Sequence, residues 1–204
     1  QTILDSADQP AHDAFVEKKS EFIGDACHID SLDEALALAD DRDQHPKARH
    51  VAYAAVCGGS DGRLAERMSD DGDIGTAGKP ILDVLRANEM TDCVVAVTRY
   101  FGGILLGSGG LIRAYSTGAS IAVKAANKAK IVPCCEYQVT LTIRNWELSE
   151  LLASVDGEQA DAQYTDRIVL SIIVPQEQSQ KSNHEYRNVN ATSRAQRHVQ
   201  SPDR

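Results

Sequence analysis

One apolar run and the glycine-rich segment after it constrain the fold most. Residues 93–98 read Cys-Val-Val-Ala-Val-Thr, a short run that is apolar at consecutive positions and rich in β-branched residues. This composition is typical of a strand buried on both faces in the middle of a sheet. A glycine-rich loop follows, and alanine-rich residues 111–128 contain no proline and predict a long helix. Its predicted buried side comprises Ile112, Tyr115, Ala119, Ala122 and Val123.

Three further patterns predict the elements that surround this strand. A Ser-x-x-Glu capping box opens residues 31–41, where apolar positions recur at helical spacing and predict a helix. Residues 50–56 alternate like a strand and run into the turn-forming residues 58–62, which predicts a hairpin or an exposed loop. Pro80 suits a first helical turn, and the apolar face predicted after it comprises Ile81, Leu82, Val84 and Leu85.

The sequence predicts two domains of an α+β protein, residues 1–133 and residues 134–204. The second, smaller domain is expected to be a small α+β sandwich built from a strand, a helix and a strand. Its predicted elements are a strand over 137–143, a helix carrying Trp146, Leu148, Leu151, Leu152 and Val155, and a strand over 168–174. Residues 175–204 are polar, and either add one helix and one edge strand or fray.

Composition excludes several classes of protein. The chain has 30 acidic and 21 basic residues and a formal net charge of −9, so a uniformly basic nucleic-acid coat is excluded. Residues 25–43 alone carry a balance of −6, with seven acids against one arginine. Five cysteines without a Cys-x-x-Cys pair predict reduced thiols in a cytoplasmic protein. No stretch approaches the ~20 apolar residues of a membrane span, and the first residues lack a signal-peptide pattern.

The loop over residues 69–80 has two interpretations. Its carboxylates, Asp70, Asp71 and Asp73, are hard oxygen ligands that could hold Mg²⁺ weakly, although acids in such loops more often form turns and cap helices. A Walker phosphate loop is excluded, because Asp73 and Pro80 replace its first glycine and its metal-binding hydroxyl. Backbone N–H groups near a helix start, together with a lysine, could instead contact an anion.

The second loop, residues 98–113, joins the buried strand to the long helix. Glycines allow close approach to a ligand, a helix N-terminus favours anions, and two flanking arginines add charge. The loop could equally be a tight turn packed under the helix. No dinucleotide-binding fingerprint, nucleophile or other catalytic residue can be identified. The predicted anion- or nucleic-acid-binding residues of both loops are Arg99, Tyr100, Gly102, Gly103, Gly107, Ser108, Gly109, Gly110, Arg113, Thr76, Gly78 and Lys79.

These motifs resemble the Impact/YigZ family, and the likeness covers residues 15–130. The matching stretches are Lys19–Gly24, His45–Ala54, Asp70–Leu82 and Val97–Tyr115, with Asp73-Ile74 where the family usually has Glu-Pro. The resemblance implies an N-terminal domain like the second domain of a small-subunit ribosomal protein. It also implies a ferredoxin-like C-terminal domain resembling one in an elongation factor, on weaker grounds that include residues 190–194.

Three functions remain open at this stage. The first is a non-enzymatic cytoplasmic regulator that contacts RNA or a translation-machinery component through the second loop, with no required cofactor. The second is an enzyme acting on a phosphorylated small molecule with Mg²⁺ in the first loop. The third is a protein-interaction regulator without an anion site. For the first, replacing Arg99 or Arg113 by alanine is expected to weaken binding by about 1–3 kcal/mol and to leave folding nearly unchanged.

Overall fold

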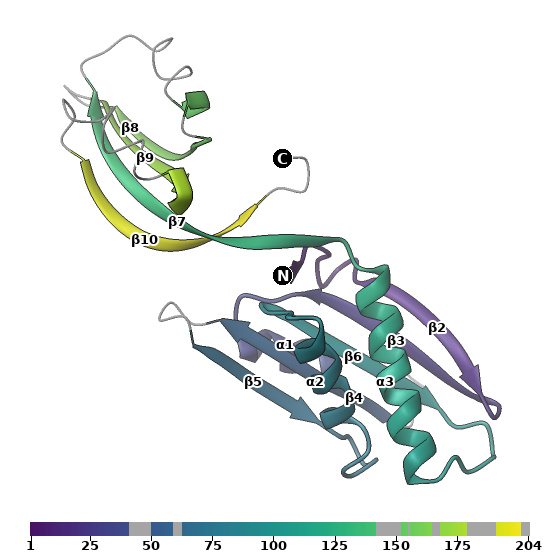
Figure 1. The fold of residues 1–204 in the computed structure, drawn as a ribbon. Helices are drawn as coiled ribbons and strands as arrows, with labels where there is room; N and C mark the ends of the chain where they lie inside the picture. Colours follow the sequence, from purple (N-terminus) through teal and green to yellow (C-terminus); the bar gives the residue numbers. More distant parts are fainter. Residues whose placement is uncertain are drawn as a thin grey trace. The chain divides into compact units, whose positions relative to one another are not determined.

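A computed structural model describes residues 1–40, 50–58, 63–141, 152–154, 156–164, 168–178 and 191–200 (Figure 1). The chain divides into two compact units, Gln1–Lys130 and Ile131–Gln200. This division falls three residues before the predicted boundary at Pro133, inside a long strand. Among the helices of the described ranges, none is both long and apolar enough to cross a membrane.

The first unit is built on a five-stranded antiparallel sheet in the order β2-β3-β6-β4-β5 (Figure 1). Its strands are β2 (Ala11–Glu17), β3 (Ser20–His28), β4 (His50–Gly58), β5 (Leu64–Ser69) and β6 (Cys93–Tyr100). Three helices cover it: α1 (Leu32–Asp40), α2 (Gly78–Ala87) and α3 (Ser108–Ala125).

Strand β6 lies at the centre of this sheet, which confirms the strand predicted over 93–98. Val95 and Val97 join the core formed with α2 and α3, whereas Val94 and Ala96 join a second core that includes Ala35 of α1. Alternate side chains of a strand point to opposite faces, so helices on both faces require an apolar residue at each position. Because helices cover both faces of the sheet at β6, the strand is apolar at consecutive positions and does not alternate with polar residues.

Helix α3 begins three residues earlier than predicted and ends at Ala125. Four of the five residues predicted for its buried side are buried, but Ile112 is 41% exposed, so that prediction is wrong. The buried positions of the helix start at Ala114. At this end of the helix Leu111 still packs against the core, whereas the neighbouring Ile112 faces solvent.

The other local predictions for this unit agree with the structure where it describes them. The Glu34 carboxylate accepts hydrogen bonds from Asp30 N at 3.0 Å and from Ser31 Oγ at 3.1 Å, and α1 starts directly afterwards. Residue 41 lies outside the described residues. Strands β4 and β5 form the predicted hairpin, closed by the pair Gly58↔Leu64. Pro80 lies in the first turn of α2.

The second unit contains more strand than predicted. The sheet that contains the long strand β7 has the order β1-β7-β9-β8, with β10 also paired to β7. Strand β1 (Thr2–Ile3) belongs to the first unit and pairs with the first residues of β7, before the division. The other elements are β7 (Lys128–Leu141), β8 (Glu158–Tyr164), β9 (Ile168–Pro175), a 3₁₀ turn η1 (Gln176–Gln178) and β10 (Ala191–Gln200).

Strand β9 confirms the prediction over 168–174, whereas β8 was not predicted. The predicted strand over 137–143 is instead part of β7, which starts at Lys128 because its first residues pair with β1. Residues 142 and 143 lie outside the described residues. Of the predicted helix, residues 152–154 are helical, and residues 146–151 and 155 also lie outside the description. The polar segment after Pro175 contributes the short η1 turn and β10.

Candidate functional site

The loop between β5 and α2 folds back on itself around Asp70. One carboxylate oxygen accepts a hydrogen bond from Gly75 N at 2.8 Å, and the other accepts from Ala77 N at 3.2 Å and Gly78 N at 2.7 Å. The last two N–H groups open α2, which has no side-chain cap at Ala77 itself. Burial opposes ionisation of Asp70, but the three N–H donors outweigh it and lower the pKa of the carboxyl. Asp70 therefore caps the helix from a distance.

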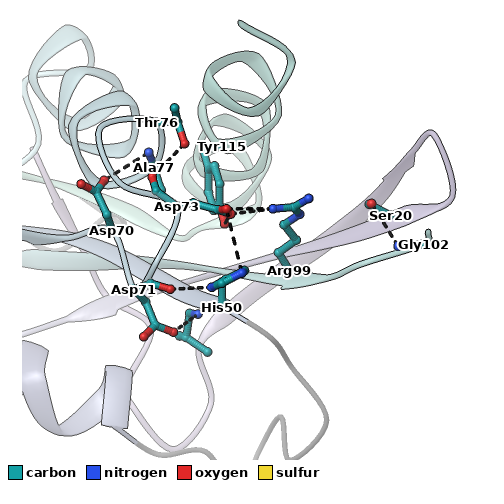
Figure 2. Close-up of polar contacts among 11 residues, drawn as sticks. Ser20, His50, Asp70, Asp71, Asp73, Thr76, Ala77, Arg99, Gly102 and Tyr115 are labelled. Atoms are coloured by element: carbon teal, nitrogen blue, oxygen red, sulfur yellow. Dashed lines mark hydrogen bonds and ion pairs between the residues drawn. The ribbon is translucent and has the colours of Figure 1, made fainter. Parts of the chain in front are cut away.

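Asp71 ties the same loop to the start of β4 (Figure 2). Its carboxylate accepts a hydrogen bond from Val51 N at 2.7 Å, and its carbonyl oxygen lies 2.5 Å from His50 Nδ1. A carbonyl oxygen only accepts hydrogen bonds, so Nδ1 carries the proton in this arrangement. The other ring nitrogen of His50 then faces Asp73 Oδ1 at 3.9 Å.

Asp73 is the centre of a buried polar network (Figure 2). Arg99 Nη1 donates to both of its carboxylate oxygens, at 2.9 and 2.7 Å, and Tyr115 OH donates to one of them at 2.6 Å. The Arg99 and Asp73 side chains are only 7% and 12% exposed. Burial and the neighbouring carboxylate raise the pKa of Tyr115 well above its usual value, so the phenol stays protonated. The charge of Arg99 is therefore compensated within the protein.

The guanidinium of Arg99 also lies against two aromatic rings. Its central carbon is 5.9 Å from the Phe22 ring centroid and 5.5 Å from that of Phe101. Phe22 is the direct cross-strand neighbour of Arg99 and meets Tyr115 edge-on, with ring centroids 5.6 Å apart. Arg99 thus forms part of the packing between the sheet and α3, in addition to its ion pair.

Through Asp73, the two glycine-rich loops meet. Asp73 belongs to the first loop, Arg99 to the strand that leads into the second, and Tyr115 to the helix that leaves it. The three carboxylates of the first loop, however, point to separate partners. Within the described part of the chain, no group of three or more His, Cys, Asp or Glu side chains could hold a metal ion. A magnesium site at Asp70, Asp71 and Asp73 stays a prediction.

The second loop is docked on the turn between β2 and β3. Gly102 N donates to Ser20 Oγ at 3.1 Å (Figure 2). A Cβ at Gly102 would lie 1.9 Å from the carbonyl oxygen of Lys19, so only glycine allows this approach. Beyond this contact Gly103, Ile104 and Leu105 are exposed, Leu105 by 81%, whereas Leu106 is buried.

A pocket of about 250 Å³ lies where the end of β2 meets the first half of α3. The residue before the helix, Gly107, provides no side-chain cap, and the first turn carries no acidic residue. Lys18 and Arg113 both line the pocket, and neither has an ion pair in the described ranges. The lining residues are Phe15, Glu17, Lys18, Leu106, Gly110, Arg113, Ala114 and Thr117.

The residues predicted for anion binding fall into two groups. Gly110 and Arg113 line the pocket, and Gly102, Gly103, Gly107, Ser108 and Gly109 lie on the loop and helix start beside it. Arg99 belongs instead to the Asp73 network, and the partly buried Tyr100 follows it at the end of β6. Thr76 Oγ1 donates to the Asp73 carbonyl at 2.8 Å, Gly78 packs on Ser69, and Lys79 pairs with Asp83 at 2.6 Å.

Sequence reasoning missed several residues of this region. His50 and Tyr115 had no assigned role in the network, and Phe15, Glu17 and Lys18 had none at the pocket. The sequence contains one signal that could have indicated the pocket, the adjacent basic residues Lys18 and Lys19. The structure places them in a turn with positive φ. No spacing rule connects that turn to α3, almost one hundred residues later.

Comparison with known proteins identifies the family. Residues 18–123, which hold strands β3 to β6 and both loops, match the Impact N-terminal domain. The Impact family member YigZ of Escherichia coli (strain K12) is 37% identical over 163 residues, covering 78% of this chain and 79% of that protein. The chain belongs to the Impact family. An Impact member of Haemophilus influenzae is 46% identical over 109 residues, covering 52% of this chain and 53% of its relative.

Solved structures extend the likeness beyond the first unit of this Impact chain. A crystal structure of a hypothetical protein aligns with 90% of this chain, and with 92% of its own, at 32% identity and a TM-score of 0.59. The two-domain translational regulator Yih1 aligns with 57% of this chain at 24% identity and a TM-score of 0.37, too weak a likeness to carry a conclusion. The mixed α/β architecture is therefore shared with a solved structure, whereas the ribosomal-protein and elongation-factor resemblances stay predictions.

Replacing Asp70 by alanine is expected to lower the free energy of unfolding by about 1–2 kcal/mol at pH 7, since α2 loses its remote cap. The folded-state pKa of Asp70 lies below the ordinary value of 3.8, so its stabilisation is complete above that value. It is lost as the pH falls through the lowered pKa. Chemical denaturation at several pH values should therefore show the two proteins converging below about pH 3.8. Asp70→Asn, which keeps one acceptor oxygen, serves as the control: it should lose less stability than Asp70→Ala at pH 7 and should approach the unmodified protein over the same pH range, because neither variant titrates at this position.

Proposed function

We propose that this Impact chain is a non-catalytic binding protein that contacts single-stranded RNA, free or within the translation machinery, at the N-terminal end of α3. The observation that carries the proposal is the meeting of Lys18, Arg113 and the uncapped helix start at one pocket. Phosphate oxygens are suited to all three, because N–H groups and unpaired cations converge there. A regulatory role in translation would follow from occupying such RNA.

The proposal moves the expected anion contact away from Arg99. That guanidinium is buried and paired with Asp73, so a phosphate would have to compete with a carboxylate already in place. Arg113 is exposed and free of ion pairs among the described residues. With a net charge of −9, the field of the whole molecule opposes an anionic ligand, so binding through this local patch is expected to be modest and to fall with added salt.

One observation favours a second candidate, a protein-interaction regulator. Ile104, Leu105 and Ile112 are 42%, 81% and 41% exposed and lie on the second loop and the first turn of α3. Exposed aliphatic side chains near one another are typical of protein-binding surfaces. Salt separates the two candidates, because phosphate contacts release counterions and apolar contacts do not. The enzyme alternative has less support, since the first-loop carboxylates already serve the fold.

Replacing Arg113 or Lys18 by alanine is expected to weaken binding to a mixed-sequence single-stranded RNA by about 1–3 kcal/mol each. Fluorescence anisotropy at a series of salt concentrations provides the measurement. The logarithm of affinity should fall with the logarithm of salt at a slope of about −0.7 per phosphate contact, hence about −1.4 for two contacts.

Lys124→Ala is the matched control, because Lys124 is an exposed lysine in the last turn of the same helix. It should leave RNA affinity unchanged. RNA affinity that is equal in all four proteins, or absent in the unmodified chain, would refute the RNA-binding proposal.

A further inference from the structure

The chemistry of the pocket lining selects among ligands. Its walls are apolar at Phe15, Leu106 and Ala114, and the last two are only 9% and 3% exposed. The Phe15 ring is stacked on Phe22, with centroids 5.3 Å apart and planes 16° from parallel. That contact fixes the ring in place before any ligand arrives. A flat, apolar group therefore suits the pocket better than a fully hydrated ion.

The polar lining carries both signs of charge. Lys18 and Arg113 are cationic, Glu17 is anionic, and Thr117 has a hydroxyl. The Glu17 carboxylate makes no hydrogen bond or ion pair in the part of the chain that the structure describes. It would repel a bare phosphate, so the pocket is not built for an anion alone. The fitting ligand combines a flat ring, an anionic group and hydrogen-bond donors, and a nucleotide has all three.

Among the bases, a free carboxylate favours guanine. Guanine presents two adjacent donors, N1–H and the 2-amino group, which match the two oxygens of a carboxylate. Adenine and cytosine present one amino donor beside a ring nitrogen that repels the second oxygen. Uracil presents one N–H between two carbonyl oxygens. Reading of the Watson–Crick edge by side chains is the usual basis of sequence preference in single-stranded RNA.

We infer that the pocket between β2 and α3 takes a guanine base, with its Watson–Crick edge at Glu17 and its phosphate between Lys18 and Arg113. The inference deepens the proposed function and rests on it for the identity of the ligand as RNA. A free guanine nucleotide offers the same chemistry, so the two sources are separated by experiment.

The test uses the full chain and five octamers of uridine that differ at one central position, which holds guanosine, inosine, adenosine, cytidine or uridine. Octamer affinities are measured by fluorescence anisotropy, and binding of GMP and UMP is measured directly by titration calorimetry. The guanosine octamer should bind about tenfold more tightly than the uridine octamer. Inosine lacks the 2-amino donor and should lose part of this preference. Glu17→Gln should abolish the preference while leaving affinity for the uridine octamer unchanged.

Glu21→Gln is the matched control, because Glu21 is an exposed glutamate of the same hairpin that does not line the pocket. It should keep the full preference for guanosine. Thermal melts confirm that both variants are folded.

The possible outcomes distinguish the guanine pocket from the proposed RNA-binding function. Equal affinity for all five octamers overturns the guanine pocket and leaves RNA binding intact. A guanosine preference that survives Glu17→Gln also overturns it. Direct binding of GMP but not UMP, lost in Glu17→Gln, with no octamer bound, supports the guanine pocket and refutes the proposed RNA-binding function. Binding of neither octamers nor GMP overturns both.

Discussion

Replacing Asp73 by alanine is expected to lower the free energy of unfolding of the first unit by about 3–5 kcal/mol. The substitution leaves the guanidinium of Arg99, which is 7% exposed, without its carboxylate in a low-dielectric surrounding. It also removes the acceptor of the Tyr115 hydroxyl. Hydrogen exchange of the β6 amides is the appropriate measurement, because it reports opening of this unit separately from the second.

Asp83→Ala is the matched control for this prediction. Asp83 is 49% exposed, and it pairs with Lys79 at 2.6 Å and with Arg86 at 3.6 Å. Exposed ion pairs contribute about 0–1 kcal/mol, so the control should change stability little. If Asp73→Ala lowers the free energy of unfolding no more than Asp83→Ala does, the fold does not need the Asp73 carboxylate to compensate the charge of Arg99.

A double substitution separates the buried charge from the packing. Asp73→Asn combined with Arg99→Met removes both charges and keeps most of the volume. Buried ion pairs replaced as a pair often cost little, whereas breaking one by removing a single partner is severe. The double variant should therefore lose less stability than the sum of the losses measured for Asp73→Asn and Arg99→Met separately. Strict additivity would mean that the two side chains act independently.

The same network connects stability to the candidate site. Asp73 holds the first loop against the end of β6 and the start of α3, and the second loop lies between these two elements. Loss of the Asp73 carboxylate would release both loops. Asp73→Ala is therefore also expected to weaken RNA binding, although Asp73 itself does not line the pocket. Glu17→Gln changes only the pocket lining. Comparing the two variants distinguishes loss of architecture from loss of a ligand contact.

Sequence patterns predicted the elements whose burial follows a simple period. Strand β6 is apolar on both faces, and α2 and α3 carry one apolar side, so periodicity was sufficient. The β2–β3 hairpin was not predicted because its burial breaks the pattern. In β2 only Ala11 is buried, and in β3 the buried residues include Ser20, Gly24 and Asp25. Small and polar residues are buried there because α3 and neighbouring strands lie close to them.

The candidate site shows a different limit of sequence reasoning. Arg99 and Arg113 flank the same loop and looked equivalent in the sequence, yet their surroundings differ. Arg99 projects from β6 beneath α3, where it meets Asp73, and Arg113 projects from the exposed first turns of α3. Asp73 is 26 residues from Arg99 and 42 from Tyr115. Only the topology of the sheet brings the three together, and no local pattern records it.

The contact between α3 and β3 is made through two glycines. A Cβ at Gly24 would lie 2.2 Å from the carbonyl oxygen of Gly118 and 3.0 Å from Ala122 Cβ. Gly118 in turn faces Val97 of β6, the cross-strand partner of Gly24. The helix backbone therefore lies directly on the sheet, and this closeness sets the position of the first turn of α3 and of the pocket.

Gly24→Ala is expected to lower the free energy of unfolding by about 3 kcal/mol, because the obstructing atom is backbone and cannot rotate away. Hydrogen exchange of β3 and β6 amides measures the effect. Gly109→Ala is the control: the nearest atom to its added Cβ is Arg113 Nη1 at 3.8 Å, and alanine is favoured over glycine within a helix. The control should be neutral or more stable, by up to about 1 kcal/mol. A loss below about 0.5 kcal/mol in Gly24→Ala, the range of ordinary surface substitutions, would contradict direct packing of α3 on β3.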